Sequence, residues 1–327
     1  MTLDPLDLRL LDGWQRGLPL VPRPFAAIGG ALWLSECTVL ARLVRLAESG
    51  AISRVGATVR PNTVGASTLA AVAAPEGRVE EVARSIGAEP GVNHSYLRED
   101  GWNLWFVMTG PDRAHVTDGL ARIAAATGLE VLDLPLVRPF NIDLGFRLAG
   151  AAHLPPAPAE ADLSALRPGD RAILAALSRG LALVAEPYAA LARGLDRPEA
   201  EVIARIAALA EAGIISRLGV IVRHRRLGWR ANAMVVWQVP EAEADAAGEA
   251  LAAQPGVTLC YRRRPDPRWP YNLYCMIHAR SRDEANATLE RAAKATGLGA
   301  LERRVLFSTR CFRQRGALVL PGKEEAA

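Results

Sequence analysis

The chain has 327 residues, of which 50% are hydrophobic and 23% charged, with a formal net charge of +4 and an isoelectric point near 9.1. This length predicts about two domains or two pairs of smaller ones. The hydrophobic fraction excludes a wholly disordered chain, and the lack of a run of about 18 apolar residues excludes a transmembrane helix. The acidic start MTLDPLDLRL and four cysteines outside any C-x-x-C pair predict a reduced, cytoplasmic protein with no signal peptide and no cysteine metal site.

The basic residues are almost all arginine, since Lys294 and Lys323 are the only lysines among the 39. Codon bias in a GC-rich genome is one explanation. The other is functional, because planar guanidinium groups bind carboxylates and phosphates better than ammonium groups do. The net charge also permits a nucleic-acid partner. Composition alone therefore leaves the nature of an anionic partner open.

The chain contains an internal repeat. Residues 48–60 (ESGAISRVGATVR) match residues 211–223 (EAGIISRLGVIVR), so that Ser53 and Ser216 lie 163 residues apart. The same spacing pairs Asp7 with Asp170. The chain is therefore two copies of a unit of about 160 residues. The Pro- and Ala-rich residues 151–161 between the copies have the composition of a linker.

Each copy divides again into a helical part and an alternating part. In the first copy we expect strands near 67–74, 91–98, 102–109 and 130–138. In the second copy a helix spans 170–179, and a later helix is capped by Asp196, ends at Gly213 and leads into a β segment over 214–222. The remainder predicts strands at 231–239, 256–263, 271–279 and 303–311, with helices at 241–254 and 281–297.

These elements predict an α+β fold built by tandem duplication. Two or three helices followed by a short β element form a winged helix-turn-helix, and the order βαββαβ is the ferredoxin-like arrangement. We therefore expect each copy to be a winged helix-turn-helix followed by a ferredoxin-like domain. The expected boundaries are, in chain order, 1–60, 61–150, a linker over 151–165, 166–223 and 224–327.

Three stretches carry a resemblance to a known family: GVNHSYLREDGWNLWF (91–106), GVIVRHRRLGWRANAMVVW (219–237) and GVTLCYRRRPDPRWPYNLYCMIH (256–278). The phrase L-x-x-x-G-x-I-S-R-x-G and the domain order resemble the Lrp/AsnC regulators. Within that superfamily the chain is similar to the sirohaem decarboxylases. It looks like their fused NirDL type, in which two subunit types form one chain, over nearly its whole length.

The resemblance implies an activity. Sirohaem loses CO2 from the acetate side chains at C12 and C18 and becomes 12,18-didecarboxysirohaem, in haem d1 or alternative haem biosynthesis. The implied site lies between the two ferredoxin-like domains, without a resident metal or a separate cofactor, and the iron arrives with the sirohaem substrate. The two copies would pair within the chain, and whether the chain assembles into a larger homo-oligomer stays open. No membrane partner is expected.

A DNA-binding regulator with a small effector is the main alternative. A recognition helix should present basic or amide side chains at its N-terminal end. Here those positions read LSECT (34–38) and RPEAE (197–201), and their glutamates would repel phosphates. Each helix also carries later arginines (Arg42, Arg45 and Arg205), which a solvated helix face explains. Palindromic DNA requires two equal recognition helices, and these two differ. We therefore expect no DNA partner. A tetrapyrrole carrier without catalysis is a third hypothesis, which sequence cannot separate from the enzyme.

A polycarboxylate such as sirohaem needs cationic groups around it, and arginine is the natural choice. Arginines end the second strand of each ferredoxin-like domain at equivalent positions, and others follow in the stretch RHRRLGWR (223–230). We expect the carboxylates to be held by Arg98, Arg223, Arg262 and Arg263.

Three histidines lie in or beside the strands that would line the cavity, and their repeat counterparts are not histidines. A side chain present in only one copy is not required by the fold. Loss of CO2 from a pyrrole-linked acetate needs a proton as the C–C bond breaks, and histidine or tyrosine can supply it near neutral pH. We expect catalytic roles for His224, His94, Tyr96 and Tyr261, and a substrate contact from His278. Axial binding of a histidine to the iron is the open alternative.

The third strand of each ferredoxin-like domain carries aromatic residues around an asparagine. Alternation sends the aromatic side chains to one face of the strand and the asparagine to the other. The aromatic residues are either sheet packing or a wall for the macrocycle. We include Asn103, Asn272 and Trp105 among the expected substrate contacts. Which acetate leaves first, and whether one or both inter-copy cavities work, stays open.

Overall fold

The computed structural model describes residues 3–141, 148 and 160–319. Within these residues the chain forms two compact units. Residues 3–64 and 160–228 belong to the first unit, and residues 65–141 and 229–319 to the second. Each unit therefore joins the corresponding parts of both sequence copies. Most of the predicted linker over 151–165 lies outside the described residues.

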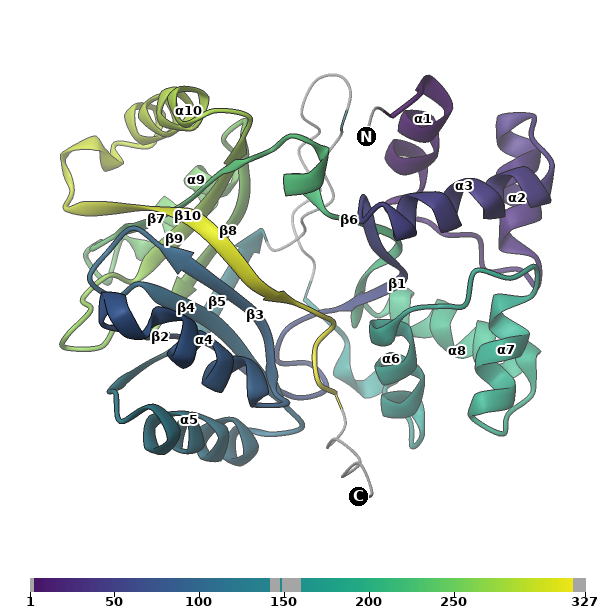
Figure 1. Ribbon diagram of the computed structural model, residues 1–327, viewed down its shortest axis with the longest axis horizontal. Helices are drawn as coiled ribbons and strands as arrows, with labels where there is room; N and C mark the ends of the chain where they lie inside the picture. Colours follow the sequence, from purple (N-terminus) through teal and green to yellow (C-terminus); the bar gives the residue numbers. More distant parts are fainter. Residues whose placement is uncertain (1–2, 142–147, 149–159, 320–327) are drawn as a thin grey trace. The chain divides into compact units, whose positions relative to one another are not determined.

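The first unit opens with the helical part of copy one (Figure 1). It consists of α1 (Pro5–Trp14), α2 (Pro24–Leu32), α3 (Glu36–Glu48) and strand β1 (Ile52–Val59). Short polar side chains cap two of these helices: Asp4 accepts from the first turn of α1, and Ser35 accepts from that of α3. No single described helix is long and apolar enough to cross a membrane; the bent pair α2 and α3 meets that criterion only when taken together.

The helical part of copy two repeats this order. It consists of η2 (Leu163–Ala165), α6 (Asp170–Arg179), α7 (Pro187–Gly194), α8 (Glu199–Glu211) and β6 (Ile215–Val222). The predicted helix over 170–179 is confirmed, and Gly213 follows the end of α8 with a left-handed φ of 70°. The prediction that Asp196 caps α8 is wrong, because Pro198 holds that position. Asp196 instead takes a φ of 52° in the turn before it, as Trp33 does in copy one with a φ of 60°.

The two β elements of the first unit pair with each other. β1 and β6 run antiparallel, and Gly56 lies opposite Gly219 at the centre of the pair. A Cβ added at Gly56 would lie 2.4 Å from the carbonyl oxygen of Leu177, and one added at Gly219 would lie 2.4 Å from that of Trp14. The ends of α6 and α1 therefore rest directly on the sheet, which only glycine permits. The helix-turn-helix parts are as expected, but the strand assigned to each wing belongs to a sheet that the two copies share.

A buried aspartate joins the first helix of each copy to the third. In copy one the Asp7 carboxylate binds Arg42 at 2.8 Å and Arg45 at 2.6 Å, and in copy two Asp170 binds Arg205 at 2.6 Å. Burial raises the pKa of Asp170, but hydrogen bonds from Arg205 and from a backbone N–H outweigh it and leave that pKa below its ordinary value. The later arginines of the predicted recognition helices therefore serve internal ion pairs.

Each alternating part has the predicted βαββαβ order. Copy one supplies β2 (Ala66–Val72), η1 (Glu76–Arg78), α4 (Val79–Ala88), β3 (Val92–Arg98), β4 (Leu104–Gly110), α5 (Arg113–Thr127) and β5 (Val131–Asn141). Copy two supplies β7 (Ala231–Trp237), α9 (Ala244–Ala252), β8 (Val257–Arg263), β9 (Leu273–Ala279), α10 (Arg282–Ala295), η4 (Leu298–Ala300) and β10 (Arg303–Gln314). The predicted ferredoxin-like domains are confirmed. A further short turn, η3 (His224–Leu227), belongs to the first unit.

The two ferredoxin-like domains close into one eight-stranded barrel with the order β10-β3-β4-β2-β5-β8-β9-β7 (Figure 1). The last strand of each copy joins the two sheets, so the barrel closes at two places. β5 pairs first with β2 and then with β8, and β10 pairs first with β7 and then with β3. The two copies therefore pair within the chain, and no edge of either sheet is left open.

Alternation along the strands produces three apolar cores in the second unit. One lies between the sheet of copy one and helices α4 and α5, and a second between the sheet of copy two and helices α9 and α10. The third fills the barrel interior with side chains from both copies, among them Trp105, Met234, Tyr274 and Leu306. A side chain in this unit faces either its own helices or the barrel interior, and its strand position decides which.

The ion pair of copy two gives a stability prediction. Replacing Arg205 with methionine leaves the buried Asp170 carboxylate without its guanidinium, and we expect the free energy of unfolding at pH 7 to fall by about 3–5 kcal/mol. Urea unfolding measures this. Because the folded-state pKa of Asp170 is depressed, the stability that the pair contributes is present above the ordinary aspartate pKa of 3.8 and is lost as pH falls through the folded-state value. The difference between variant and parent should therefore shrink in acid.

The control for this prediction is Arg45→Met. The Arg45 side chain is 46% exposed, and Arg42 still binds Asp7 when Arg45 is removed, so we expect a loss of at most about 1 kcal/mol. Equal losses in the two variants would contradict the assignment of Asp170 and Arg205 as the stabilising pair.

Candidate active site

The second strand of each ferredoxin-like domain presents three side chains to the barrel interior. In β8, Tyr261 belongs to the interior core and Leu259 packs against it, with Arg263 two residues farther on. The repeat places His94, Tyr96 and Arg98 at the matching positions of β3. The structure therefore brings predicted catalytic and carboxylate-binding residues of both copies to the interior face of one barrel.

Arg98 and Arg263 make equivalent contacts across the boundary between the copies. Arg98 donates from Nη1 to the carbonyl oxygen of Leu306 at 3.1 Å, and Arg263 donates from Nη1 to that of Leu134 at 2.7 Å. Each acceptor lies in the last strand of the other copy, at a repeat-equivalent position. Both arginines thus tie the strand on which they lie to the strand that closes the barrel.

Aromatic faces surround the Arg263 guanidinium. Its central carbon lies 4.6 Å from the ring centre of Tyr261 and 6.0 Å from that of Tyr274, and these rings stack with centres 5.6 Å apart. Burial lowers the pKa of Arg263 and raises the pKa of the Tyr261 phenol, although nearby arginines partly oppose the second shift. Tyr261 is therefore a neutral phenol, and a weaker acid than an exposed tyrosine.

Arg262 lies on the opposite face of β8 from the other predicted site residues. Its guanidinium binds Asp245 at 2.8 Å and also binds Glu241, beside the outer helix α9. These two carboxylates hold the pKa of Arg262 above its ordinary value, with Asp245 the larger contributor. The structure does not bring Arg262 together with Arg98 and Arg263, since alternation along a strand separates neighbouring residues.

The two predicted asparagines bind backbone. Asn103 donates to the carbonyl oxygen of Ala74 at 2.8 Å and accepts from its N–H at 2.9 Å. Asn272 does the same with Val239, at 2.8 Å and 3.0 Å. Each amide therefore closes a two-bond clamp on the segment that leaves the first strand of its domain. This accounts for an asparagine at the same place in both copies without a substrate contact.

Trp105 packs inside the barrel core with only 1% of its surface exposed. Its ring meets Trp269 edge to face at 5.2 Å, and Trp269 donates from its indole N–H to the Tyr274 hydroxyl at 3.0 Å. Sequence analysis missed Trp269, which follows β8 in the stretch RPDPRWPYN. An aromatic residue between prolines in a connecting loop was the signal for it. These contacts favour packing within the barrel, rather than a wall for the macrocycle, as the role of Trp105.

The two barrel histidines occupy different strand positions. His94 lies in β3 and stacks over Tyr96 with ring centres 6.4 Å apart. His278 lies in β9, two residues after the interior residue Met276, and its Nδ1 lies 2.6 Å from the hydroxyl oxygen of Thr258. Each ferredoxin-like domain thus supplies one histidine, from a different strand.

His224 and Arg223 belong to the first unit. His224 opens η3 and is buried, with 8% of its surface exposed. Arg223 donates its backbone N–H to the carbonyl oxygen of Ala51 at 2.8 Å, and its guanidinium approaches Gly50. Arg223 therefore lies against the junction of α3 and β1 in copy one. Both residues belong to the first unit, whereas the other predicted site residues lie in the second.

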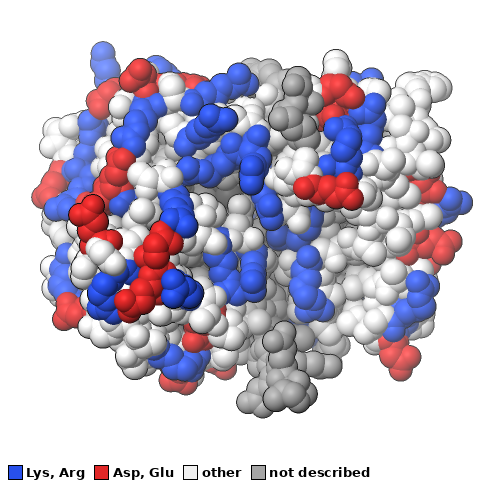
Figure 2. Space-filling model, in the orientation of Figure 1, with Lys and Arg blue, Asp and Glu red and all other residues white. Residues whose placement is uncertain are grey.

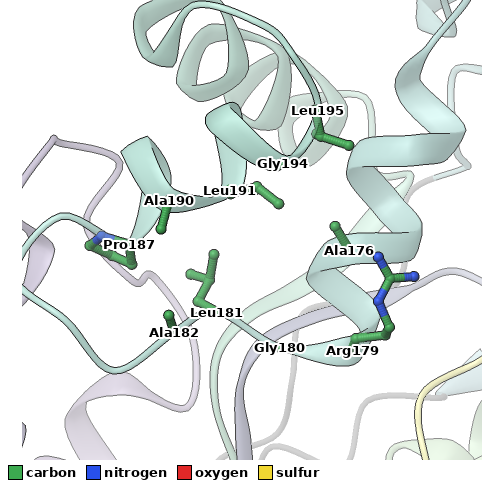
Figure 3. A pocket seen from close by; sticks show the side chains of 10 residues that line it. All are labelled: Ala176, Arg179, Gly180, Leu181, Ala182, Pro187, Ala190, Leu191, Gly194 and Leu195. Carbon is green, nitrogen blue, oxygen red and sulfur yellow. The ribbon is translucent and has the colours of Figure 1, made fainter.

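A cavity of about 260 Å³ lies in the helical part of copy two (Figure 3). It opens between the end of α6, the following loop and α7, and its lining is apolar except for Arg179. Ligand sites are usually about 300–1,000 Å³, so this cavity is too small for a tetrapyrrole. None of the predicted site residues lines it.

Basic side chains gather along β10 on the face shown in Figure 2. Several already bind acids, since Arg303 pairs with Glu290 and Arg310 with Glu80. Arg313 instead donates to the backbone carbonyl oxygen of Glu89. Burial lowers the pKa of Arg313, and the charge of the neighbouring Arg315 lowers it further. Among the residues that the structure describes, no cluster of three or more His, Cys, Asp or Glu could hold a metal ion.

The asparagine clamps give a second prediction. Asn272→Ala leaves the buried N–H and C=O groups of Val239 without their hydrogen bonds. We therefore expect the free energy of unfolding to fall by about 1–3 kcal/mol. Asn103→Ala should cost less, because its bonds to Ala74 are only partly buried and water can replace them. Thermal or urea unfolding of both variants measures this. A larger loss from the copy-one variant would refute the explanation by burial.

Comparison with known proteins extends over both parts of each copy. A family model described as "AsnC-like ligand binding domain" matches residues 64–141 and 226–313, and one described as "Siroheme decarboxylase NirDL-like HTH domain" matches residues 7–52 and 170–215. The chain is 62% identical to the siroheme decarboxylase NirDL subunit of Paracoccus denitrificans over 98% of both chains. It is 53% identical to the siroheme decarboxylase NirD subunit of Stutzerimonas stutzeri, over 45% of this chain and 97% of that one.

Solved structures agree. The crystal structure of the siroheme decarboxylase NirDL in complex with an iron-uroporphyrin III analogue superposes with a TM-score of 0.68 and 26% identity, over 95% of this chain and 93% of that one. The duplicated fold and the full-length identity together place the chain: it belongs to the sirohaem decarboxylase NirDL family.

Proposed function

We propose that the chain converts sirohaem to 12,18-didecarboxysirohaem by removing CO2 from the acetate side chains at C12 and C18, in haem d1 biosynthesis. The observation that carries this proposal is 62% identity to a NirDL subunit over 98% of both chains, which includes both copies. The complex of a relative with an iron-porphyrin analogue supports sirohaem as the ligand class. We further propose that no separate cofactor is needed, that the iron belongs to the substrate, and that the enzyme is cytoplasmic.

Each decarboxylation is redox-neutral. The bond between the methylene carbon and the carboxylate breaks, CO2 leaves, and the electron pair stays on the methylene carbon, which takes a proton and becomes a methyl group. The protein must therefore bind a polycarboxylate, orient each acetate and deliver one proton for each CO2 released. Histidine suits the delivery because its pKa lies near neutrality.

We propose His94 and His224 as proton donors, with Tyr96 and Tyr261 as orienting neighbours. Tyr261 orients rather than donates, because burial raises the pKa of its phenol. His278, Arg98, Arg263 and Arg223 are proposed to contact substrate carboxylates. We leave Arg262 out of this set because its guanidinium is engaged by Asp245 and Glu241. Asn103, Asn272 and Trp105 are left out because their contacts are with the fold itself.

The regulator hypothesis is not favoured. Arg42, Arg45 and Arg205, the arginines that could face DNA phosphates, are bound to buried aspartates. The N-terminal turns of α3 and α8 carry glutamates. Phosphate contacts dominate DNA affinity, and both features reduce them.

Mass spectrometry tests the proposed reaction. We expect anaerobic incubation of the purified chain with sirohaem to give a product lighter by two CO2 units, with an intermediate lighter by one. A boiled sample controls for spontaneous loss. Sirohaem that binds and is recovered with unchanged mass would refute the enzyme and favour a carrier.

Single histidine variants test the proton donors. Loss of a general acid slows a reaction by about 10²–10⁴-fold, so we expect His94→Ala and His224→Ala each to lower the single-turnover rate within that range. His115→Ala serves as the control, because His115 lies in α5 and is not part of the proposed site. A variant that decarboxylates at the parent rate removes that histidine from the mechanism.

A further inference from the structure

Strands β8 and β9 are neighbours in the barrel (Figure 1). Thr258 of β8 and His278 of β9 form a side-chain pair between them. The Thr258 hydroxyl oxygen lies 2.6 Å from Nδ1 of His278 and 2.9 Å from the backbone carbonyl oxygen of Met276. Both distances are those of hydrogen bonds. One hydroxyl group thus joins the imidazole ring to the backbone of the strand that carries it.

Counting protons fixes the direction of both bonds. A hydroxyl group has one hydrogen to donate, and a carbonyl oxygen can only accept. Thr258 must therefore give its proton to the carbonyl of Met276, and it can only accept from His278. His278 must in turn carry a hydrogen on Nδ1. In the neutral ring this leaves the lone pair on Nε2.

Strand alternation gives the side of the sheet on which this ring lies. Tyr274 and Met276 in β9 belong to the barrel interior core, and Cys275 and Ile277 to the outer core under the helices. His278 continues the first series and lies on the interior face, opposite Asn232 of β7. Both Tyr261 and Arg263 lie on that same face in the adjoining strand.

Copy one lacks this pair. Thr109 stands at the position of His278 and Asn93 at that of Thr258. Thr109 donates to the carbonyl oxygen of Gly91 at 3.1 Å and accepts from the N–H of Leu318 at 2.9 Å. The same barrel position is thus built without an imidazole, so the fold does not require the Thr258–His278 pair.

We propose that Thr258 is a positioning residue that holds His278 in the Nδ1-protonated form, so that Nε2 is the nitrogen that gains and loses the proton. The bond to Thr258 persists in both charge states, because Nδ1 donates in the neutral ring and in the imidazolium. When Nε2 takes a proton the ring can donate to a carboxylate without turning. That this carboxylate belongs to sirohaem rests on the proposed function; the form of the ring does not.

Imidazole nitrogen resonances test the assignment directly in the free, full-length chain. With [15N]histidine labelling, the His278 signals are those that disappear in His278→Gln. We expect the neutral ring to show its hydrogen on Nδ1. A hydrogen on Nε2 in the native chain would overturn the proposal, and this result needs no variant of Thr258 and no turnover.

Variants of Thr258 test the consequence, with iron-uroporphyrin III as the tetrapyrrole polycarboxylate. Thr258→Val keeps the shape but removes the hydroxyl, and we expect an altered ratio of the two ring forms and a dissociation constant about 10-fold higher. Thr258→Ser should restore both. Thr109→Val, which removes a buried hydroxyl in copy one from the position equivalent to His278, should change neither.

These outcomes separate the two proposals. If Thr258→Val changes neither ring form nor affinity, the positioning role is wrong, whatever the enzyme does with sirohaem. If the native chain binds tetrapyrrole through the expected ring form but releases no CO2, the proposed reaction fails and the positioning role stands.

Discussion

The second unit depends on one constraint: the last strand of each ferredoxin-like domain is longer than the sheet to which it belongs. β5 and β10 pair with their own copy over the first half and with the other copy over the second half. A four-stranded sheet alone would expose unpaired backbone at its edges, and the exchange removes every such edge. Neither copy can complete this arrangement by itself. Fusion into one chain makes the pairing intramolecular and so raises its effective concentration.

The same exchange explains where Arg98 and Arg263 lie. Arg98 and Arg263 each reach a carbonyl oxygen in the closing strand of the other copy. A buried cation is costly without partners, and here carbonyl dipoles and aromatic faces take that role. These contacts are equivalent in the two copies because both hold the barrel closed. The histidines depart from symmetry: His94 and His278 lie at non-equivalent positions, and the equivalent positions of the other copy hold Leu259 and Thr109. Asymmetric histidine positions thus lie on a nearly symmetric frame.

Much of this could be predicted from local patterns, and the failures have identifiable causes. The helix over 170–179, the break at Gly213 and both βαββαβ orders follow from periodicity and glycine position. Arg262 and Arg263 are neighbours in sequence, but period-two alternation puts their side chains on opposite faces of β8, so only Arg263 faces the barrel interior. The residue type of Asp196 predicts a helix cap, but Asp196 takes a left-handed conformation in the preceding turn, and Pro198 is the N-cap of α8. The backbone partners of Asn103 and Asn272 could not be predicted from local patterns, because they lie more than 25 residues away.

The sequence by itself determined the duplication, the order of the elements and the family, because these depend on repeat spacing, local periodicity and residue identity along one chain. Only the tertiary structure decided which strands exchange, which arginines are already bound to acids, and which hydroxyl group fixes the proton on His278. These features depend on contacts between residues far apart in the chain, such as Arg98 with Leu306. Such contacts leave no periodic trace in the sequence, since they arise from strand register and from the closure of the barrel.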